Sequence, residues 1–194
     1  MNLTPRFRPG RRTVLAASAA AAAVLLPTVA LASSAGSDTA GAPATGRCIE
    51  GDLTDWIGIP GGATAGSTYY QLEISDTSSA ACTMYGFPGV SALGPGGVHL
   101  GSAASRLAGY PEQKITLQPG ETAHVVLQIT DVGNYPPSVC HAKAADALFV
   151  YAPGDYSAKE IPFSFQACAK KGPIFLHVSP TIAGTGIPGY STAP

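Results

Sequence analysis

Apolar and polar residues alternate along several short stretches of this chain, which is the pattern of half-buried β-strands. Within 69–76 Tyr70, Leu72 and Ile74 alternate with polar residues, and within 122–130 every second residue from Ala123 is apolar. In both stretches the intervening polar residues are expected to face solvent. Further short strands are expected at 82–84, 90–93, 98–100, 115–117, 148–151, 161–165 and 174–178.

Glycine and proline residues separate these stretches. Gly94-Pro95-Gly96-Gly97 predicts a hairpin between two strands. Gln118-Pro119-Gly120-Glu121 fits a type II turn, with proline at the second position and glycine at the third. The longer connections are expected to be loops, at 52–67, 101–113 and 131–139.

No part of the chain after the N-terminal segment shows a 3.6-residue helical period. Many short strands separated by Gly/Pro turns are typical of antiparallel sandwiches and barrels. The strand lengths and spacings are uneven, which favours a sandwich. The sequence therefore predicts an all-β fold built as an antiparallel β-sandwich.

Residues 1–32 have the features of an export signal. Four arginines precede an uncharged run over 13–31, and Ala30-Leu31-Ala32 supplies a small-residue cleavage site. A run of this length could also anchor a protein in a membrane. Its high alanine content and Pro27 favour a cleaved signal. Arg11-Arg12 also fits a twin-arginine signal, so the export route stays open between that pathway and the general secretory one.

The remainder divides into a flexible leader at 33–46, a domain at 47–180 and a loose C-terminal tail at 181–194. After removal of the signal the chain keeps seven basic and twelve acidic residues, a net charge of −5. Because phosphate binding needs clustered lysine and arginine, nucleic acid is not an expected partner. We expect a monomer with no membrane span after cleavage.

The four cysteines are Cys48, Cys82, Cys140 and Cys168. An even number behind an export signal predicts disulfides, and the lack of any C-x-x-C pair disfavours zinc. Of the three possible pairings we expect Cys48–Cys82 and Cys140–Cys168. Each bond would tie a segment with little structure of its own to a residue next to a strand.

No motif of a known catalytic or metal site is present, so we expect no catalytic residue, metal ligand or cofactor. Residues 89–93 come nearest to the nucleophile elbow G-x-S-x-G, but they end in leucine. The histidines do not form a metal-binding pair, and each is expected to be solvated on a strand or loop. They are His99, His124, His141 and His177.

Three aromatic residues in the expected loops are candidate ligand contacts. Trp56 lies among glycine and proline residues, so we expect it to plug one end of the core, with ligand binding as the alternative. Asp52 and Asp55 form an acidic cluster beside it, a candidate for calcium or sugar contact. Tyr110 and Tyr135 are amphipathic rings of the kind common in interfaces.

Five segments carry a family resemblance. Cys82–Val90 reads Cys-Thr-Met-Tyr-Gly-Phe-Pro-Gly-Val, and Leu117–Thr122 contains a Leu-x-Pro-Gly turn. Leu148–Pro153, Ile161–Phe163 and Val178–Pro180 supply three further matches. The chain resembles an uncharacterised domain-of-unknown-function family of secreted actinobacterial proteins with a Cys-Thr-x-Tyr-Gly-Tyr/Phe-Pro-Gly-Val motif. The resemblance implies a secreted, disulfide-bonded, immunoglobulin-like sandwich and implies no activity.

These observations predict a secreted, non-enzymatic binding or scaffold module. Its partner would be a cell-wall glycan or an extracellular protein. The alternative is a secreted hydrolase with a carboxylate or histidine site that has no recognised motif. The alternative requires at least two convergent titratable groups in a concave pocket.

Overall fold

A computed structural model describes residues 45–64 and 66–186 of this protein. The predicted signal at 1–32 and nearly all of the predicted leader at 33–46 lie outside these residues. The strands are β1 (Gly46–Arg47), β2 (Leu53–Ile57), β3 (Gly62–Thr64), β4 (Ser67–Asp76), β5 (Cys82–Tyr85), β6 (Gly89–Gly94), β7 (Val98–Leu100), β8 (Ser105–Arg106), β9 (Lys114–Leu117), β10 (Thr122–Thr130), β11 (Ala142–Tyr151), β12 (Ala158–Cys168), β13 (Leu176–Val178) and β14 (Ile182–Ala183). The helical elements are single turns: η1 (Glu50–Asp52), η2 (Pro95–Gly97), η3 (Val132–Asn134) and α1 (Pro137–Cys140).

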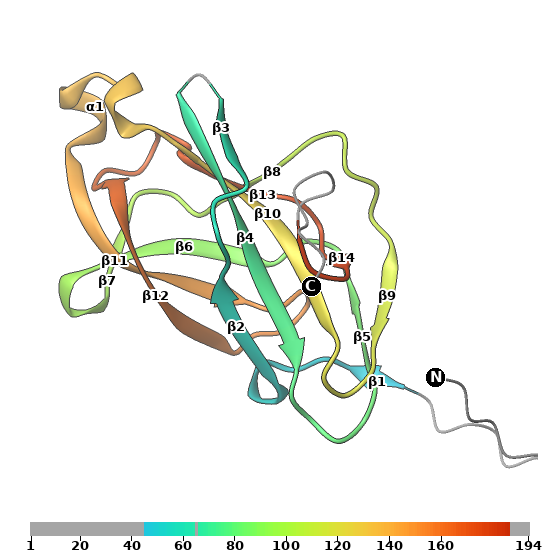
Figure 1. Cartoon of the computed structure of the whole chain (residues 1–194). Coiled ribbons are helices and arrows are strands. Elements are labelled where there is room, and N and C mark those ends of the chain that lie inside the picture. The colour runs from blue at the N-terminus through green and yellow to red at the C-terminus, as the bar shows by residue number, and fades with distance from the viewer. Residues whose placement is uncertain (1–44, 65, 187–194) are drawn as a thin grey trace, which may run out of the picture. The chain divides into compact units, whose positions relative to one another are not determined.

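The strands form three sheets (Figure 1). The seven-stranded sheet has the order β2-β4-β10-β13-β8, with β3 added to β4 and β14 to β10. The four-stranded sheet has the order β12-β11-β6-β7, and the three-stranded sheet the order β1-β5-β9. Two short pairs, β1 with β5 and β13 with β8, are parallel, and the other pairs are antiparallel. The predicted all-β sandwich is confirmed.

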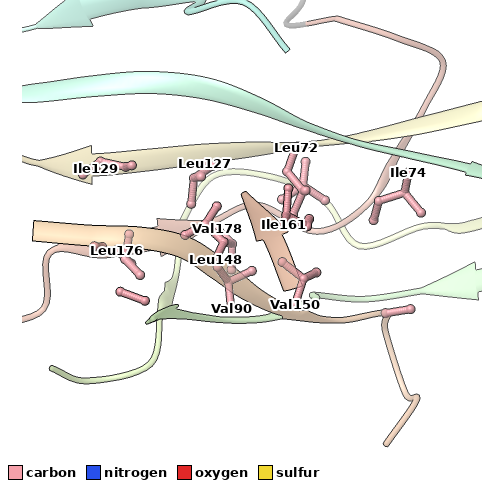
Figure 2. Packing of buried hydrophobic residues seen from close by; sticks show 14 of the residues in the cluster. Leu72, Ile74, Val90, Leu127, Ile129, Leu148, Val150, Ile161, Leu176 and Val178 are labelled. Atoms are coloured by element: carbon pink, nitrogen blue, oxygen red, sulfur yellow. The ribbon is translucent and has the colours of Figure 1, made fainter. Parts of the chain in front are cut away.

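The core lies between the seven-stranded and four-stranded sheets (Figure 2). Leu72 and Leu127 come from one sheet, and Val90, Leu148 and Val150 from the other; all are at most 2% exposed. Burying one such side chain contributes about 1.5–3 kcal/mol. Figure 1 shows that the strands of the two sheets cross instead of running parallel.

The central pair of the larger sheet, β4 and β10, is buried on both sides. The two strands pair over nine residues each, and their apolar residues face the core as predicted. Gln71, Glu73 and His124 on the opposite side, expected to be solvated, are also buried, at 6%, 4% and 2% exposed. The reason is that residues 179–186 lie against this side, where Gly184 and Gly186 contact His124 and Glu73.

The expected loop at 52–67 contains two strands, and the predicted position of Trp56 was wrong. β2 and β3 both pair with β4, so the glycine- and proline-containing residues between them form only the connection. Trp56 lies in β2 opposite Glu73. Side chains alternate along a strand, so Trp56 points away from the core and is 39% exposed. It does not plug the end of the core.

The C-terminal strand is bulged. β13 and β14 both pair with β10, but the step from Val178 to Ala183 is five residues while the step between their partners Leu127 and Ala123 is four. The extra residue makes β13 and β14 one strand interrupted by a β-bulge. Pro180 lies in this interruption, where its missing N–H removes no ladder hydrogen bond.

The C-terminal tail, predicted to be loose from residue 181, begins in the sheet. Ile182 and Ala183 pair with β10, and Thr181 is 1% exposed. Pairing with the long central strand orders these residues despite their glycine- and proline-rich surroundings. The last part of the tail, 187–194, lies outside the described residues.

Both predicted disulfides are confirmed. Cys48 bonds to Cys82 across 34 residues with a Cα–Cα distance of 4.8 Å. Cys140 bonds to Cys168 across 28 residues with a Cα–Cα distance of 4.5 Å. The first bond joins the start of the domain to β5, and the second joins α1 to the end of β12. Each disulfide therefore holds a short segment, the start of the domain or α1, that contributes few apolar side chains to the core.

Loss of either disulfide should lower the free energy of unfolding by about 3–4 kcal/mol through the entropy of the unfolded chain. We expect Cys48→Ser and Cys82→Ser to lose similar amounts, and the double variant to lose no more than either single variant. Urea unfolding followed by circular dichroism measures these values. A double variant that loses the sum of the two single effects would contradict a bond between these residues.

Candidate functional site

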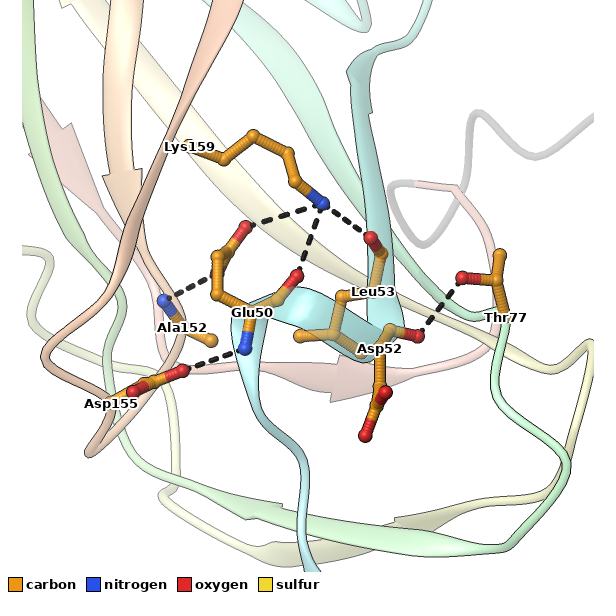
Figure 3. A network of polar contacts seen from close by, with 7 residues as sticks. All are labelled: Glu50, Asp52, Leu53, Thr77, Ala152, Asp155 and Lys159. Carbon is orange, nitrogen blue, oxygen red and sulfur yellow. Dashed lines mark hydrogen bonds and ion pairs between the residues drawn. The ribbon is translucent and has the colours of Figure 1, made fainter.

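A network of polar groups is buried where the start of the domain meets the four-stranded sheet (Figure 3). Glu50 is 3% exposed. Its Oε2 accepts a hydrogen bond from the backbone N–H of Ala152 (3.1 Å), and its Oε1 lies 3.6 Å from Lys159 Nζ. Lys159 also donates to the carbonyls of Glu50 and Leu53, and Asp155 accepts from the Glu50 N–H (2.6 Å). The network anchors η1 to β11, β12 and the turn between them.

Asp55 extends this network into the core. It lies in β2 opposite Ile74, and both its carboxyl oxygens are buried without an N–H donor among the described residues. Burial, a hydrogen bond with the Glu50 carboxyl and the negative charge of Glu50 raise the pKa of Asp55 to about 8, against the opposing charge of Lys159. Asp55 therefore holds a proton at neutral pH and shares it with Glu50.

A second titratable pair lies on the opposite side of the larger sheet. Glu73 in β4 and His124 in β10 are register partners. His124 Nδ1 donates to the Gly184 carbonyl (2.8 Å), and the Gly186 N–H donates to Glu73. Burial raises the pKa of Glu73 and lowers that of His124. Both changes favour the neutral forms, and the prediction of a solvated His124 was wrong.

The predicted cluster of Asp52, Asp55 and Trp56 is not formed. Asp55 and Trp56 are neighbours in a β-strand, so their side chains point to opposite sides of the sheet. Asp55 enters the core and Trp56 leaves it, while Asp52 is exposed in η1. Among the described residues no group of three or more histidine, cysteine or acidic side chains could hold a metal ion.

Tyr110 lines two concave sites, one on the outer side of the seven-stranded sheet and one between β14 of that sheet and β9 of the three-stranded sheet. One has a volume of about 330 Å³ and the other about 190 Å³, and Tyr110 lines both. Neither has a charged residue in its lining. The larger is lined by Tyr110, Pro111, Gln113, Ile115, Thr181, Ile182 and Ala183. The smaller is lined by Gly61, Gly62, Ala63, Thr64, Tyr69, Tyr110 and Val126.

The three aromatic residues predicted as ligand contacts are not all brought together. Trp56 lies on the same outer side of the sheet as Tyr110. The register partner of Trp56 on β4 is Glu73, which is four residues, or about 13 Å, along the strand from Tyr69 in the smaller site. Tyr135 instead packs against the core, and its hydroxyl donates to the Ile174 carbonyl (2.7 Å). Its hydroxyl is thus committed to a structural contact.

Sequence reasoning missed Tyr69 and the contact between Glu50, Asp55 and Lys159. Tyr69 was placed in a strand, but its contribution to the Tyr110 site depends on where the 101–113 connection crosses the sheet. Lys159 is more than 100 residues from Glu50 in the sequence, so no local pattern could indicate their contact. The one sequence feature that could have indicated a buried Glu50 was its position two residues after a disulfide cysteine.

Raising the pH toward 8 should destabilise the domain through Asp55. The folded state holds the Asp55 proton up to about pH 8, whereas the unfolded chain releases it near the ordinary pKa of 3.8. The free energy of unfolding therefore falls between these values as the pH rises, by at most about 1.4 kcal/mol per pH unit for this one group. Asp55→Asn stays uncharged at every pH and can donate to Glu50. It should therefore lack the part of the pH-dependent fall in the free energy of unfolding that Asp55 causes.

The comparison is urea unfolding of wild type, Asp55→Asn and the exposed control Asp52→Asn at each pH from 5 to 9. The difference between wild type and Asp55→Asn isolates Asp55 from the other titrating groups. We expect Asp55→Asn to gain stability relative to wild type with each step up to pH 8, and Asp52→Asn to follow wild type. A constant difference across the range would show that Asp55 is ionised in the fold.

Comparison with known proteins gives the family. No curated protein and no solved structure matches the chain. No helix in the described ranges is long and apolar enough to span a membrane. A family model described as a domain of unknown function (DUF4232) matches residues 48–180, from the first disulfide cysteine to the proline in the β-bulge. The chain therefore belongs to the DUF4232 family.

Proposed function

We propose that this domain is a secreted, monomeric, non-enzymatic binding module that holds a cell-wall glycan on the outer side of its seven-stranded sheet. The observation that carries the proposal is the position of Tyr110 as the common wall of two adjacent concave sites. A residue that lines both sites can contact two successive units of a chain-like ligand. The hydroxyl gives the same ring a polar group for hydrogen bonding.

The chemistry of the two sites favours an uncharged, hydroxylated ligand. Their linings contain no acidic or basic side chain, so an ionic ligand would lose hydration without gaining a partner charge. Gln113, Thr64 and two tyrosine hydroxyls supply polar groups among apolar neighbours such as Pro111. Few polar groups in a mostly apolar concavity are the usual composition of a ligand site.

Trp56 would extend the surface along the sheet. It lies on the same side as the Tyr110 sites and is 39% exposed, at the edge strand β2. Because Gln71 and Glu73 on this side of β4 are covered, a polymer would reach Trp56 from the smaller site only by passing over the covering segments, a path of more than about 13 Å. A single sugar would not reach it, so a contribution from Trp56 is expected only with an extended glycan.

The position of the buried carboxyl groups supports binding over hydrolysis. Glu50, Asp55 and Glu73 each lie near other titratable groups, but none of them lines any of five well-formed concave sites on the described part of the chain. Glycoside hydrolysis requires two carboxyl groups that flank the scissile bond of a bound substrate. The carboxyl groups here are instead used to hold segments of the domain together.

Two disulfides support secretion. Both cysteine pairs are oxidised, and such bonds persist in the oxidising space outside the cytoplasm. The predicted export signal agrees with this location. The two disulfides hold the domain in one conformation, so its sheet surface can bind without rearrangement, which lowers the entropic cost of binding.

Substitution of Tyr110 tests the proposal. In a pull-down with purified cell wall, Tyr110→Ala should bind roughly tenfold more weakly, because an aromatic residue at the centre of a site typically contributes more than about 1.4 kcal/mol. Tyr156→Ala is the matched control, since Tyr156 is 95% exposed and lines neither site. Trp56→Ala should weaken retention of long glycans more than that of soluble short fragments.

Circular dichroism and urea unfolding establish that each variant is folded before binding is compared. Equal retention of Tyr110→Ala and Tyr156→Ala would refute the assignment of this surface. Retention that requires protein in the cell-wall preparation, and is lost after its removal by protease, would identify an extracellular protein as the partner instead of a glycan. Release of soluble sugar by the wild type would refute the non-enzymatic proposal.

A further inference from the structure

A third concave site lies on a different sheet and has a different chemistry. It has a volume of about 460 Å³ and is lined by residues of the three-stranded sheet and of the turn between β11 and β12. Its lining contains two cations and no carboxylate, in a chain whose secreted part is net acidic. The lining residues are Arg47, Thr83, Met84, Tyr85, Lys114, Pro153 and Gly154.

Strand register places Arg47, Tyr85 and Lys114 around one surface. In the three-stranded sheet Arg47 is the partner of Thr83, and Tyr85 is the partner of Lys114. Thr83 and Tyr85 are two residues apart in β5, so they share one side, while Met84 between them is 2% exposed in the core. The two cations therefore flank the tyrosine from the strands on either side of β5.

Tyr85 is the exposed aromatic residue of the segment that carries the family motif. Its neighbours Cys82 and Met84 are buried in the core and Phe87 packs against it, but Tyr85 is 60% exposed. Its ring is not needed to fill the core. An exposed aromatic ring beside two cations is a typical means of holding a ligand that combines a charge with a carbon framework.

The two cations are available to a ligand. Within the described part of the chain, the one ion pair found within 4 Å involves Lys159, and no hydrogen bond occupies the Lys114 ammonium. Arg47 donates one guanidinium hydrogen to the Gly154 carbonyl, which leaves its other donors. The backbone N–H groups of Glu50, Ser157 and Tyr156 donate to the Asp155 carboxylate and lower its pKa, and the charge of Arg47 adds a smaller lowering.

One further carboxylate lies near the site. Glu112 Oε2 is 3.4 Å from the position that a Cβ on Gly86 would occupy, next to Tyr85 and two residues before Lys114. It does not line the concave site. With Arg47 and Lys114 in the lining and Glu112 outside it, the interior of the site is cationic.

The site is held in place before any ligand binds. The Cys48–Cys82 disulfide joins the residues that follow Arg47 and precede Thr83, which fixes β1 against β5. The opposite wall at Gly154 is held by the Arg47 contact and by the hydrogen bond from the Glu50 N–H to Asp155. Preorganised charges lose little conformational entropy on binding.

We propose that this surface binds the oxyanion group of a small anionic ligand or of an anionic unit in a polymer. Arg47 and Lys114 contact the phosphate or carboxylate oxygens, and the Tyr85 ring covers the attached carbon framework. Guanidinium and ammonium groups donate to phosphate and carboxylate in the same way, so the charge chemistry is common to both sources. This site is separate from the uncharged Tyr110 surface and can be tested separately.

The test is isothermal titration calorimetry at low salt with two probes, glycerol 1-phosphate and galacturonate. The proteins are wild type, Lys114→Gln, Tyr85→Ala and the control Lys143→Gln, in which an exposed lysine of β11 outside the site is changed. We expect Lys114→Gln to weaken binding roughly fivefold, as for loss of one exposed charge pair, and Lys143→Gln to leave it unchanged. The probe that binds more tightly identifies phosphate or carboxylate as the natural group.

Binding of the preferred probe should also weaken as sodium chloride rises from 20 to 200 mM, because the contact is ionic and exposed. No binding of either probe by wild type would overturn the proposal. Equal affinities of wild type, Lys114→Gln and Lys143→Gln would overturn it as well. Tyr110→Ala should bind the anion like wild type, so this result does not depend on the proposed glycan surface.

The role of the disulfide can be tested with a matched pair of variants. Cys48→Ala/Cys82→Ala should lose anion binding, because β1 and Arg47 are then free to leave β5. Cys140→Ala/Cys168→Ala removes a disulfide far along the chain and should keep it. Circular dichroism identifies the folded variants, and if either pair is unfolded the Lys114→Gln comparison still decides the proposal.

Discussion

The packing of β4 and β10 against β6 and β11 is the constraint on which the rest of this domain depends. Residues such as Leu127 and Leu148 are completely buried between the two sheets. A region this dry cannot hold an unpaired charge. The polar groups that enter it are therefore paired: Glu50 accepts from the Ala152 N–H and faces Lys159, and Asp55 keeps its proton. The core thus determines the protonation state of Asp55 at its edge as well as the stability of the fold.

The start of the domain connects this core to the anion-binding surface. From Arg47 to Leu53 the chain has little apolar surface of its own, and it is held by a disulfide and by the Glu50 network. These same contacts fix Arg47 beside Tyr85. The buried polar groups are explained as the anchor of a binding surface.

The two proposed surfaces differ because they lie on sheets with different outer residues. Around Tyr110 the connection from β8 to β9 and the bulged C-terminal strand cover the sheet with neutral residues. Around Tyr85 the short strands β1 and β9 contribute one cation each, Arg47 and Lys114. A cell-wall polymer that carries both uncharged sugars and anionic groups offers a ligand for each surface.

The sequence determined the fold class, the strands with regular alternation and the turns at Gly94–Gly97 and Gln118–Glu121, because these depend on local spacing. It favoured, of three possible pairings, the two disulfides that the structure shows. Only the tertiary structure decided that β4 and β10 are buried on both sides. His124 and Glu73 have a polar strand pattern, but residues 179–186 cover them, and that contact is made by a segment more than 50 residues away. Trp56 was misplaced because nearby glycine and proline residues indicate a loop, whereas pairing with β4 extends the strand past them. Lys159 and Glu50 form their contact, and Tyr110 and Tyr69 line one site, where segments remote in sequence meet, and a local pattern carries no information about such meetings.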